Sequence, residues 1–242
     1  MARTNKNKEA AIGSQNRTVG PNEAKSALTH CIKLQRPIMM WGAPGIGKSD
    51  IVKQIADAEG REVIDIRLPL WEPTDIKGIP YYNAKENNMV WASPAELPTD
   101  PKSNAIVFLD ELNSAAPAVQ AAAYQLILNR RVGQYHLPKD VSIVAAGNRD
   151  SDKGVTYRMP APLANRFVHV ELRVDFEDWM EWATTNHIHP DVVGYCTFAK
   201  QDLYDFDPRG SSRSFATPRS WSFVSQLLSD DLPESTLTDL VA

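Results

Sequence analysis

The fold of this chain is decided by one stretch, Pro37-Ile38-Met39-Met40-Trp41-Gly42-Ala43-Pro44-Gly45-Ile46-Gly47-Lys48-Ser49. Its apolar start, residues 38–41, predicts a buried strand, and the spacing of apolar residues within 50–56 predicts an amphipathic helix. The loop between them fits the pattern G-x-x-x-x-G-K-[ST] at every fixed position. A strand, a glycine loop and a helix in this order are the context in which the pattern binds phosphate.

The glycine loop predicts contacts with the phosphates of a nucleotide. Glycines allow successive backbone N–H groups to turn toward one phosphate, and the following helix adds partial positive charge at its N-terminus. Lys48 would reach the β- and γ-phosphates, and the Ser49 hydroxyl would bind Mg²⁺. A glycine-rich surface turn is the alternative interpretation. The expected nucleotide-binding residues of the loop are Gly42, Ala43, Pro44, Gly45, Ile46, Gly47, Lys48 and Ser49.

A second apolar run, residues 105–109, predicts a strand covered on both faces, and it ends in Asp110-Glu111. Two adjacent acids at the carboxyl end of a buried strand are costly without a cation. An Asp at this position can hold Mg²⁺ or its water shell, and the following Glu can orient an attacking water. Two surface acids at the start of a helix are the alternative, which the nearby phosphate loop disfavours.

Three further polar residues follow or precede predicted elements. Asn148 ends the apolar strand 141–148, where it could bind the γ-phosphate or the attacking water, although a lone Asn after Gly is more often a turn residue. Arg166 directly precedes the predicted strand 167–172, a position usually occupied by a surface charge. Arg219 lies in the first turn of a helix that Thr217-Pro218 begins, where a bound phosphate would offset its unfavourable interaction with the helix dipole.

The order of these elements predicts an α/β fold. Strands and helices alternate over residues 37–172, and the five strands predict a parallel sandwich within a nucleotide-binding core at 19–174. Residues 71–98 form a proline-rich insert with a β-hairpin, which is too long for an ordinary connection. Residues 1–18 are expected to be a disordered basic tail, and residues 175–242 a small helical lid.

Composition excludes several classes of protein. The net charge of −4 gives no overall basic surface for nucleic acid. No apolar run approaches the roughly 20 residues of a membrane span, and the N-terminus lacks the apolar centre of a signal peptide. Cys31 and Cys196 are too few for a disulfide framework or a metal cluster. We therefore expect a cytoplasmic protein with no membrane partner, and the acidic net charge disfavours a nucleic-acid partner.

Taken together, the motifs resemble an AAA+ ATPase, and most closely the MoxR branch of that superfamily. The likeness runs from about Val19 to the end of the chain. Two segments are specific to MoxR: Asp110-Glu111-Leu112-Asn113 followed by residues 117–120, and residues 73–78, which resemble a helix-2 insert that projects toward the ring pore. The general motifs are Walker A at 42–49, Walker B at 106–111, sensor 1 at Asn148, the arginine-finger box at 163–167 and sensor 2 at 217–219.

The resemblance implies a ring, usually a hexamer, that hydrolyses ATP with Mg²⁺ at each subunit interface. Glu111 and Asn148 would be catalytic, Arg166 would act in trans on the neighbour's γ-phosphate, and Arg219 would contact the nucleotide from the lid. Asp110 and Ser49 would hold the metal. Relatives of this branch act as chaperones on a protein partner, often one with a von Willebrand factor A domain.

Two departures from the family pattern concern the interface and the lid. Ser114 stands where the family often has an arginine, and its substitute would be Arg130, Arg131 or Arg149. The lid is short and lacks a final helix bundle, so we expect it to be incomplete and the natural chain to continue.

Two other functions fit parts of the sequence. A nucleic-acid motor would use the basic tail and the arginines of 209–219, and DNA-stimulated turnover that weakens steeply with salt would identify it. A nucleotide-binding scaffold without turnover would need the phosphate loop alone. The presence of Asp110, Glu111 and Arg166 argues against the scaffold.

Overall fold

The computed structural model describes residues 18–152, 156–210 and 214–230, and the rest of the expected tail and the end of the expected lid lie outside these ranges. A six-stranded sheet forms the centre, and every pair of neighbouring strands is parallel. In spatial order its strands are β1 (Thr18–Val19), β10 (Val168–Leu172), β2 (Ile38–Trp41), β9 (Ser142–Gly147), β6 (Ile106–Asp110) and β3 (Val63–Arg67).

The parallel α/β class is confirmed, and the five strands expected within residues 37–172 are all present, but the sheet has six strands rather than five. The sixth strand is β1, in which Thr18, the last residue of the expected tail, pairs with Glu171 and Val19 pairs with Leu172. Two residues are too short for hydrophobic alternation to indicate a strand. Their extended conformation depends on β10, which lies far away in the sequence.

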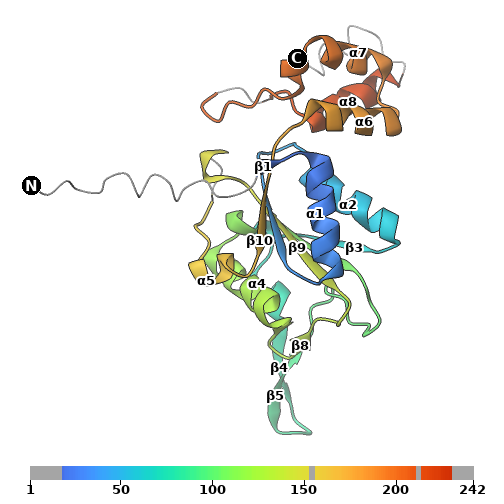
Figure 1. Ribbon diagram of the computed structural model, residues 1–242. Coiled ribbons are helices and arrows are strands. Elements are labelled where there is room, and N and C mark those ends of the chain that lie inside the picture. The colour runs from blue at the N-terminus through green and yellow to red at the C-terminus, as the bar shows by residue number, and fades with distance from the viewer. Residues whose placement is uncertain (1–17, 153–155, 211–213, 231–242) are drawn as a thin grey trace, which may run out of the picture.

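Helices cover both faces of the sheet (Figure 1), as the continuous apolar runs of its strands require. On one face α1 (Pro21–Lys33) and α2 (Lys48–Glu59) pack over side chains such as Met40 and Phe108. On the other face α4 (Pro117–Asn129) and the short α5 (Ala161–Ala164) pack over Met39 and Leu109. Successive residues of each strand thus enter opposite halves of the core, as the period of two predicts.

The insert forms a hairpin that is separate from the main sheet. After β3 come a 3₁₀ turn (Leu68–Leu70) and α3 (Pro73–Lys77), and then β4 (Ile79–Asn83) pairs antiparallel with β5 (Asn88–Ala92). This confirms the predicted hairpin, which projects from the end of the molecule remote from the lid (Figure 1). A second small hairpin, β7 (Arg131–Val132) with β8 (Tyr135–His136), was not predicted.

The described part of residues 175–242, for which we keep the name lid from the sequence expectation, contains α6 (Phe176–Thr185), α7 (Pro190–Phe198), a 3₁₀ turn (Lys200–Leu203) and α8 (Pro218–Leu228). Its own small core includes Trp179, Val192 and Cys196. The predicted cap of α8 is present, because the Thr217 side chain accepts a hydrogen bond from the backbone N–H of Ser220. Within the described ranges, no helix combines the length and the hydropathy that a membrane crossing needs.

Candidate active site

The strand order brings the predicted site residues to one edge of the sheet. β2, β9 and β6 are neighbours, so the phosphate loop, Asn148 and Asp110 follow the carboxyl ends of three adjacent strands. Open parallel sheets bind their ligands at such an edge. The order of the strands in the sheet therefore brings together motifs such as those of Lys48 and Asn148, which lie 100 positions apart in the sequence.

The phosphate loop has the backbone that its glycines predict. Gly45 and Gly47 have φ values of +76° and +92°, in the left-handed region that favours glycine. Gly47 is the residue before α2, and it has no side chain that could cap the helix. The first backbone N–H groups of α2 are therefore available to an anion at a helix N-terminus, where the helix dipole also favours negative charge.

Lys48 lies folded over the loop. Its Nζ donates hydrogen bonds to the carbonyl oxygens of Gly42 at 2.7 Å and Ala43 at 3.0 Å, and to Oδ1 of Asn148 at 3.3 Å. Burial lowers the pKa of Lys48 to about 8, although the charge of the nearby Asp110 acts in the opposite direction. A phosphate anion beside Nζ would stabilise the charged form and raise this pKa again.

The acid pair has an unusual backbone. Glu111 has a φ of +54° and so lies in the left-handed region, which is uncommon for a residue other than glycine. Its N–H donates to Oδ1 of Asp110 at 2.9 Å, which fixes the Asp110 carboxylate at the strand end. Conformations of this kind cost roughly 1–3 kcal/mol and cluster at active sites. The turn redirects the chain after β6, so the two carboxylates do not simply continue the strand.

Asn113 belongs to the site, although none of the sequence motifs assigned it a role. It is buried, with an exposed fraction of 2%, and its side chain makes two hydrogen bonds to the backbone of Asn148. Nδ2 donates to the Asn148 carbonyl at 2.8 Å, and Oδ1 accepts from the Asn148 N–H at 3.2 Å. Asn113 thus holds Asn148 in place. Its position two residues after the acid pair was the available signal.

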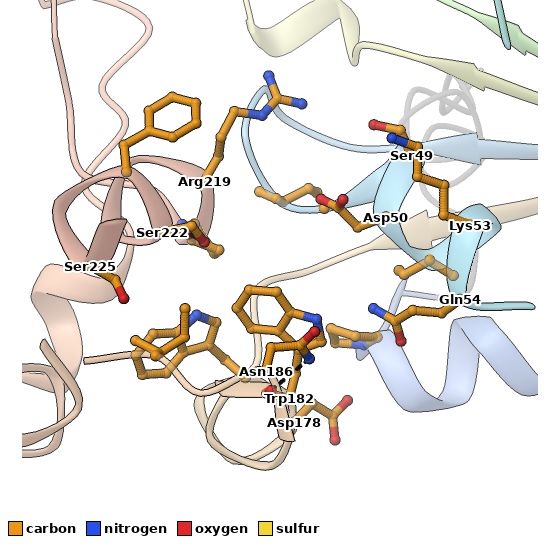
Figure 2. Close-up of a pocket in the computed structure, with 18 of the residues that line it drawn as sticks. Ser49, Asp50, Lys53, Gln54, Asp178, Trp182, Asn186, Arg219, Ser222 and Ser225 are labelled. Carbon is orange, nitrogen blue, oxygen red and sulfur yellow. Dashed lines mark hydrogen bonds between the residues drawn. The ribbon is translucent and has the colours of Figure 1, made fainter. Parts of the chain in front are cut away.

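A cavity of about 1230 Å³ lies between the core and the lid, and Ile46, Gly47, Ser49 and Arg219 are among the residues that line it. Figure 2 shows Arg219 reaching from α8 toward α2, which carries Ser49. The cavity is large enough for a nucleotide, since small-molecule sites are typically about 300–1,000 Å³.

The lid also contacts the phosphate loop directly. The backbone N–H of Arg219 donates to the carbonyl of Gly45 at 3.2 Å. A Cβ atom at Gly45 would lie 2.8 Å from Oγ1 of Thr217, so no larger residue fits there without displacing the lid. We call this contact of Gly45 with residues 217–219 the lid seam.

Arg166 lies elsewhere. It is exposed, two residues after the end of α5. Like Lys48, Asp110, Glu111 and Asn148, it is not among the residues that line the cavity. Two of the three candidate interface arginines make intrasubunit contacts: Arg130 donates to backbone carbonyls including that of Pro138, and Arg149 forms ion pairs with Asp152 and Glu171. Arg131 is exposed on β7.

The donor set fits Mg²⁺ held together with phosphate. Ser49 and Asp110 offer hard oxygen ligands, which Mg²⁺ prefers, and it commonly keeps waters and substrate phosphates as its other ligands. In the part of the chain that the structure describes, no group of three or more His, Cys, Asp or Glu residues could hold a metal alone. Burial and the charge of Asp110 raise the pKa of Asp65, an acid that lines the cavity.

This fold and this loop define the class of the protein, an AAA+ P-loop ATPase. Residues 37–167 match the AAA domain of the dynein-related subfamily, over just more than half of the chain. The chain belongs to this family.

Its relatives include very long proteins. Midasin of Giardia intestinalis is 29% identical over 185 residues, which are 72% of this chain and 4% of the relative. Midasin of Dictyostelium discoideum is 25% identical over 166 residues, which are 62% of this chain and 3% of the relative. The chain therefore spans a small fraction of the length of these two relatives.

Solved structures share the fold. A candidate ATPase of Cytophaga hutchinsonii superposes with a TM-score of 0.52 at 22% identity, covering 72% of this chain and 52% of that one. A RuvB variant of Thermotoga maritima gives a TM-score of 0.55 at 16% identity, covering 92% of this chain and 69% of that one. Both support the AAA+ α/β fold.

Proposed function

We propose that this chain is one subunit of a ring, most simply a hexamer, that hydrolyses ATP with Mg²⁺ at sites shared between neighbouring subunits. The observation that carries the proposal is the separation of the site into two parts. Lys48, Asn148 and Asp110 converge at the carboxyl ends of β2, β9 and β6, whereas Arg166 is exposed and precedes the amino end of β10, at the opposite edge of the sheet. An exposed arginine of this kind is suited to reach the nucleotide of an adjacent subunit.

Each residue then has a role in hydrolysis. The N-terminus of α2 and Lys48 bind the phosphates, and Arg219 reaches them from the lid. Ser49 and Asp110 hold Mg²⁺, which neutralises charge on the phosphate oxygens when bound. Glu111 polarises the attacking water, and Asn148, fixed by Asn113, positions it. Arg166 of the adjacent subunit stabilises the charge that develops in the transition state.

The partner is proposed to be a protein, as in the MoxR branch, with a von Willebrand factor A domain as the first candidate and the cytoplasm as the compartment. The insert supports a protein partner, because its hairpin exposes large apolar side chains. Ile79, Tyr81, Tyr82 and Met89 have exposed fractions of 64%, 50%, 59% and 56%. Aromatic and methionine side chains are enriched at protein interfaces.

A mixing experiment tests the shared site. Glu111→Gln subunits should bind ATP and assemble without turnover while still supplying Arg166, and Arg166→Ala subunits should retain a sound catalytic site that lacks the neighbour's arginine. Each variant alone should be nearly inactive, and an equimolar mixture should recover steady-state ATP hydrolysis. A mixture as inactive as its components would overturn the shared-site mechanism. Mass measurement with ATP bound checks the size of the ring.

A further inference from the structure

His169 links the strand before the phosphate loop to the helix before Arg166. On neighbouring strands, His169 of β10 lies opposite Met39 of β2, so Trp41, two residues further on, lies on the same face. The rings of His169 and Trp41 are nearly parallel, with 6.0 Å between centroids and 10° between planes. Nε1 of Trp41 lies 2.9 Å from Nδ1 of His169, and Nε2 of His169 lies 2.7 Å from the carbonyl oxygen of Ala164.

These two contacts define the protonation of the imidazole. An indole nitrogen can only donate, so Nδ1 of His169 is the acceptor. A carbonyl oxygen can only accept, so Nε2 of His169 carries the hydrogen. Both contacts are satisfied together by one neutral tautomer, and the ring therefore has a defined orientation as well as a defined position.

The Ala164 carbonyl lies at the end of α5, two residues before Arg166. Around it the backbone is held by buried side chains, since Leu163 and Phe167 have exposed fractions of 2% and 7%. The Arg166 N–H donates to the Leu163 carbonyl at 2.8 Å, and the edge of the Phe167 ring faces His169 at 6.2 Å between centroids. The His169 side chain therefore joins this turn to β10, the strand beside β2.

We infer that His169 is a positioning residue for Arg166: it fixes the end of α5 so that the arginine is presented to the adjacent subunit. The inference rests on the proposed function, because it gives Arg166 its role in trans. The link to Trp41 orients the imidazole so that Nε2 meets the Ala164 carbonyl. Small displacements of a catalytic group are costly, and about 1 Å can reduce a rate roughly 100-fold.

Two substitutions of similar polarity separate the two hydrogen bonds. His169→Asn places its amide near the position of Nδ1, so it can still accept from Trp41 but cannot reach Ala164. His169→Gln places its amide nitrogen near Nε2, so it can still donate to Ala164. We expect kcat for ATP to fall roughly 10- to 100-fold in the Asn variant and to stay within a few-fold in the Gln variant, with the affinity for a fluorescent ATP analogue unchanged in both.

Mixing with Glu111→Gln subunits then locates the defect. The Asn variant keeps its own catalytic site and lacks a well-placed arginine from its neighbour, so the mixture should recover activity as the Arg166→Ala mixture does. Equal loss in the Asn and Gln variants, or no recovery where Arg166→Ala recovers, would overturn the positioning role. If the mixture of Arg166→Ala with Glu111→Gln recovers no ATP hydrolysis, the site is not shared between subunits. The proposed function is then overturned, and the role of His169 is overturned with it.

Discussion

Lys48 makes nucleotide binding dependent on pH. Because burial lowers its pKa to about 8, the lysine of the free protein loses its proton as the pH rises through 8, whereas a bound phosphate restores it. At pH 9 we therefore expect ATP binding to take up a proton and the Kd to rise by up to about tenfold per pH unit. Calorimetry in buffers of different ionisation enthalpy measures this uptake.

Lys48→Arg is the matched control, since a guanidinium stays charged at this pH. It should take up no proton at pH 9, even if it binds ATP more weakly. Identical uptake by the two proteins would assign the titration to another group.

Asn113 tests whether a residue that touches no nucleotide supports turnover. Asn113→Leu removes both hydrogen bonds to the backbone of Asn148, so we expect a loss of about 1–3 kcal/mol in the free energy of unfolding. Because Asn148 is then free to move while Lys48 and its loop remain, kcat should fall more than KM rises. Denaturant unfolding and steady-state kinetics measure the two effects.

Gln120→Leu provides the comparison for this substitution. Gln120 is also a buried amide, with an exposed fraction of 3%, and it donates to the carbonyl of Ala115 rather than to Asn148. It should lose comparable stability and keep its kcat. Equal kcat in both variants would remove Asn113 from the support of the site.

The residues of the site were predictable to different degrees. Gly45, Lys48 and Asp110 belong to local patterns in which each position has a fixed chemical task, so the sequence alone indicated them. The roles of Asn113 and His169 depend on contacts with residues that are distant in the sequence. Asn113 bonds to Asn148, which is 35 positions away, and His169 bonds to Trp41, which is 128 positions away. Such pairs are created by the strand order, which no local pattern encodes.

The lid seam depends on the first turn of α8. Thr217→Ala removes the side chain that accepts from the Ser220 N–H, and we expect it to destabilise the helix by about 0.5–2 kcal/mol. Since the same turn contacts Gly45, nucleotide binding should weaken as well. Amide hydrogen exchange over residues 219–228 measures the effect on the helix, and these amides should exchange faster in Thr217→Ala than in the unchanged protein. Thr217→Ser keeps the cap, and exchange as fast as in the Ala variant would show that the cap does not hold the helix.

Among the secondary-structure elements, length decided what could be predicted. β2, β6 and β9 are apolar runs bounded by loops, and α2, α4 and α8 have clear helical starts, so all of them were expected. The strands β1, β7 and β8 have two residues each, which is too short for a hydrophobic pattern to indicate a strand. Helix α7 was missed because its sequence includes Gly194 and neighbouring β-branched residues, which have weak helical propensity.

The projecting hairpin should be independent of the rest of the molecule. Among the described strands, β4 and β5 pair only with each other. Replacing residues 82–89 by Asn-Gly therefore closes the strands at the Tyr81–Val90 pair and leaves the six-stranded sheet untouched. We expect the free energy of unfolding to change by less than about 0.5 kcal/mol, as for surface substitutions. Denaturant titration checks this, and a loss of cooperative unfolding would show that the hairpin supports the core.

The position of β10 in the sheet has a consequence for synthesis on the ribosome. β10 lies between β1 and β2, and β1 pairs with no other strand in the described residues. A nascent chain that has not yet reached Val168 therefore leaves β1 without a neighbour and the edge of β2 open. At about 5–20 residues per second, the N-terminal strand waits roughly 8–30 s for its partner. The strand that carries His169 is also the one that closes the sheet beside the phosphate loop, so a chain arrested before it would have its glycine loop but an unfinished edge open to other polypeptides.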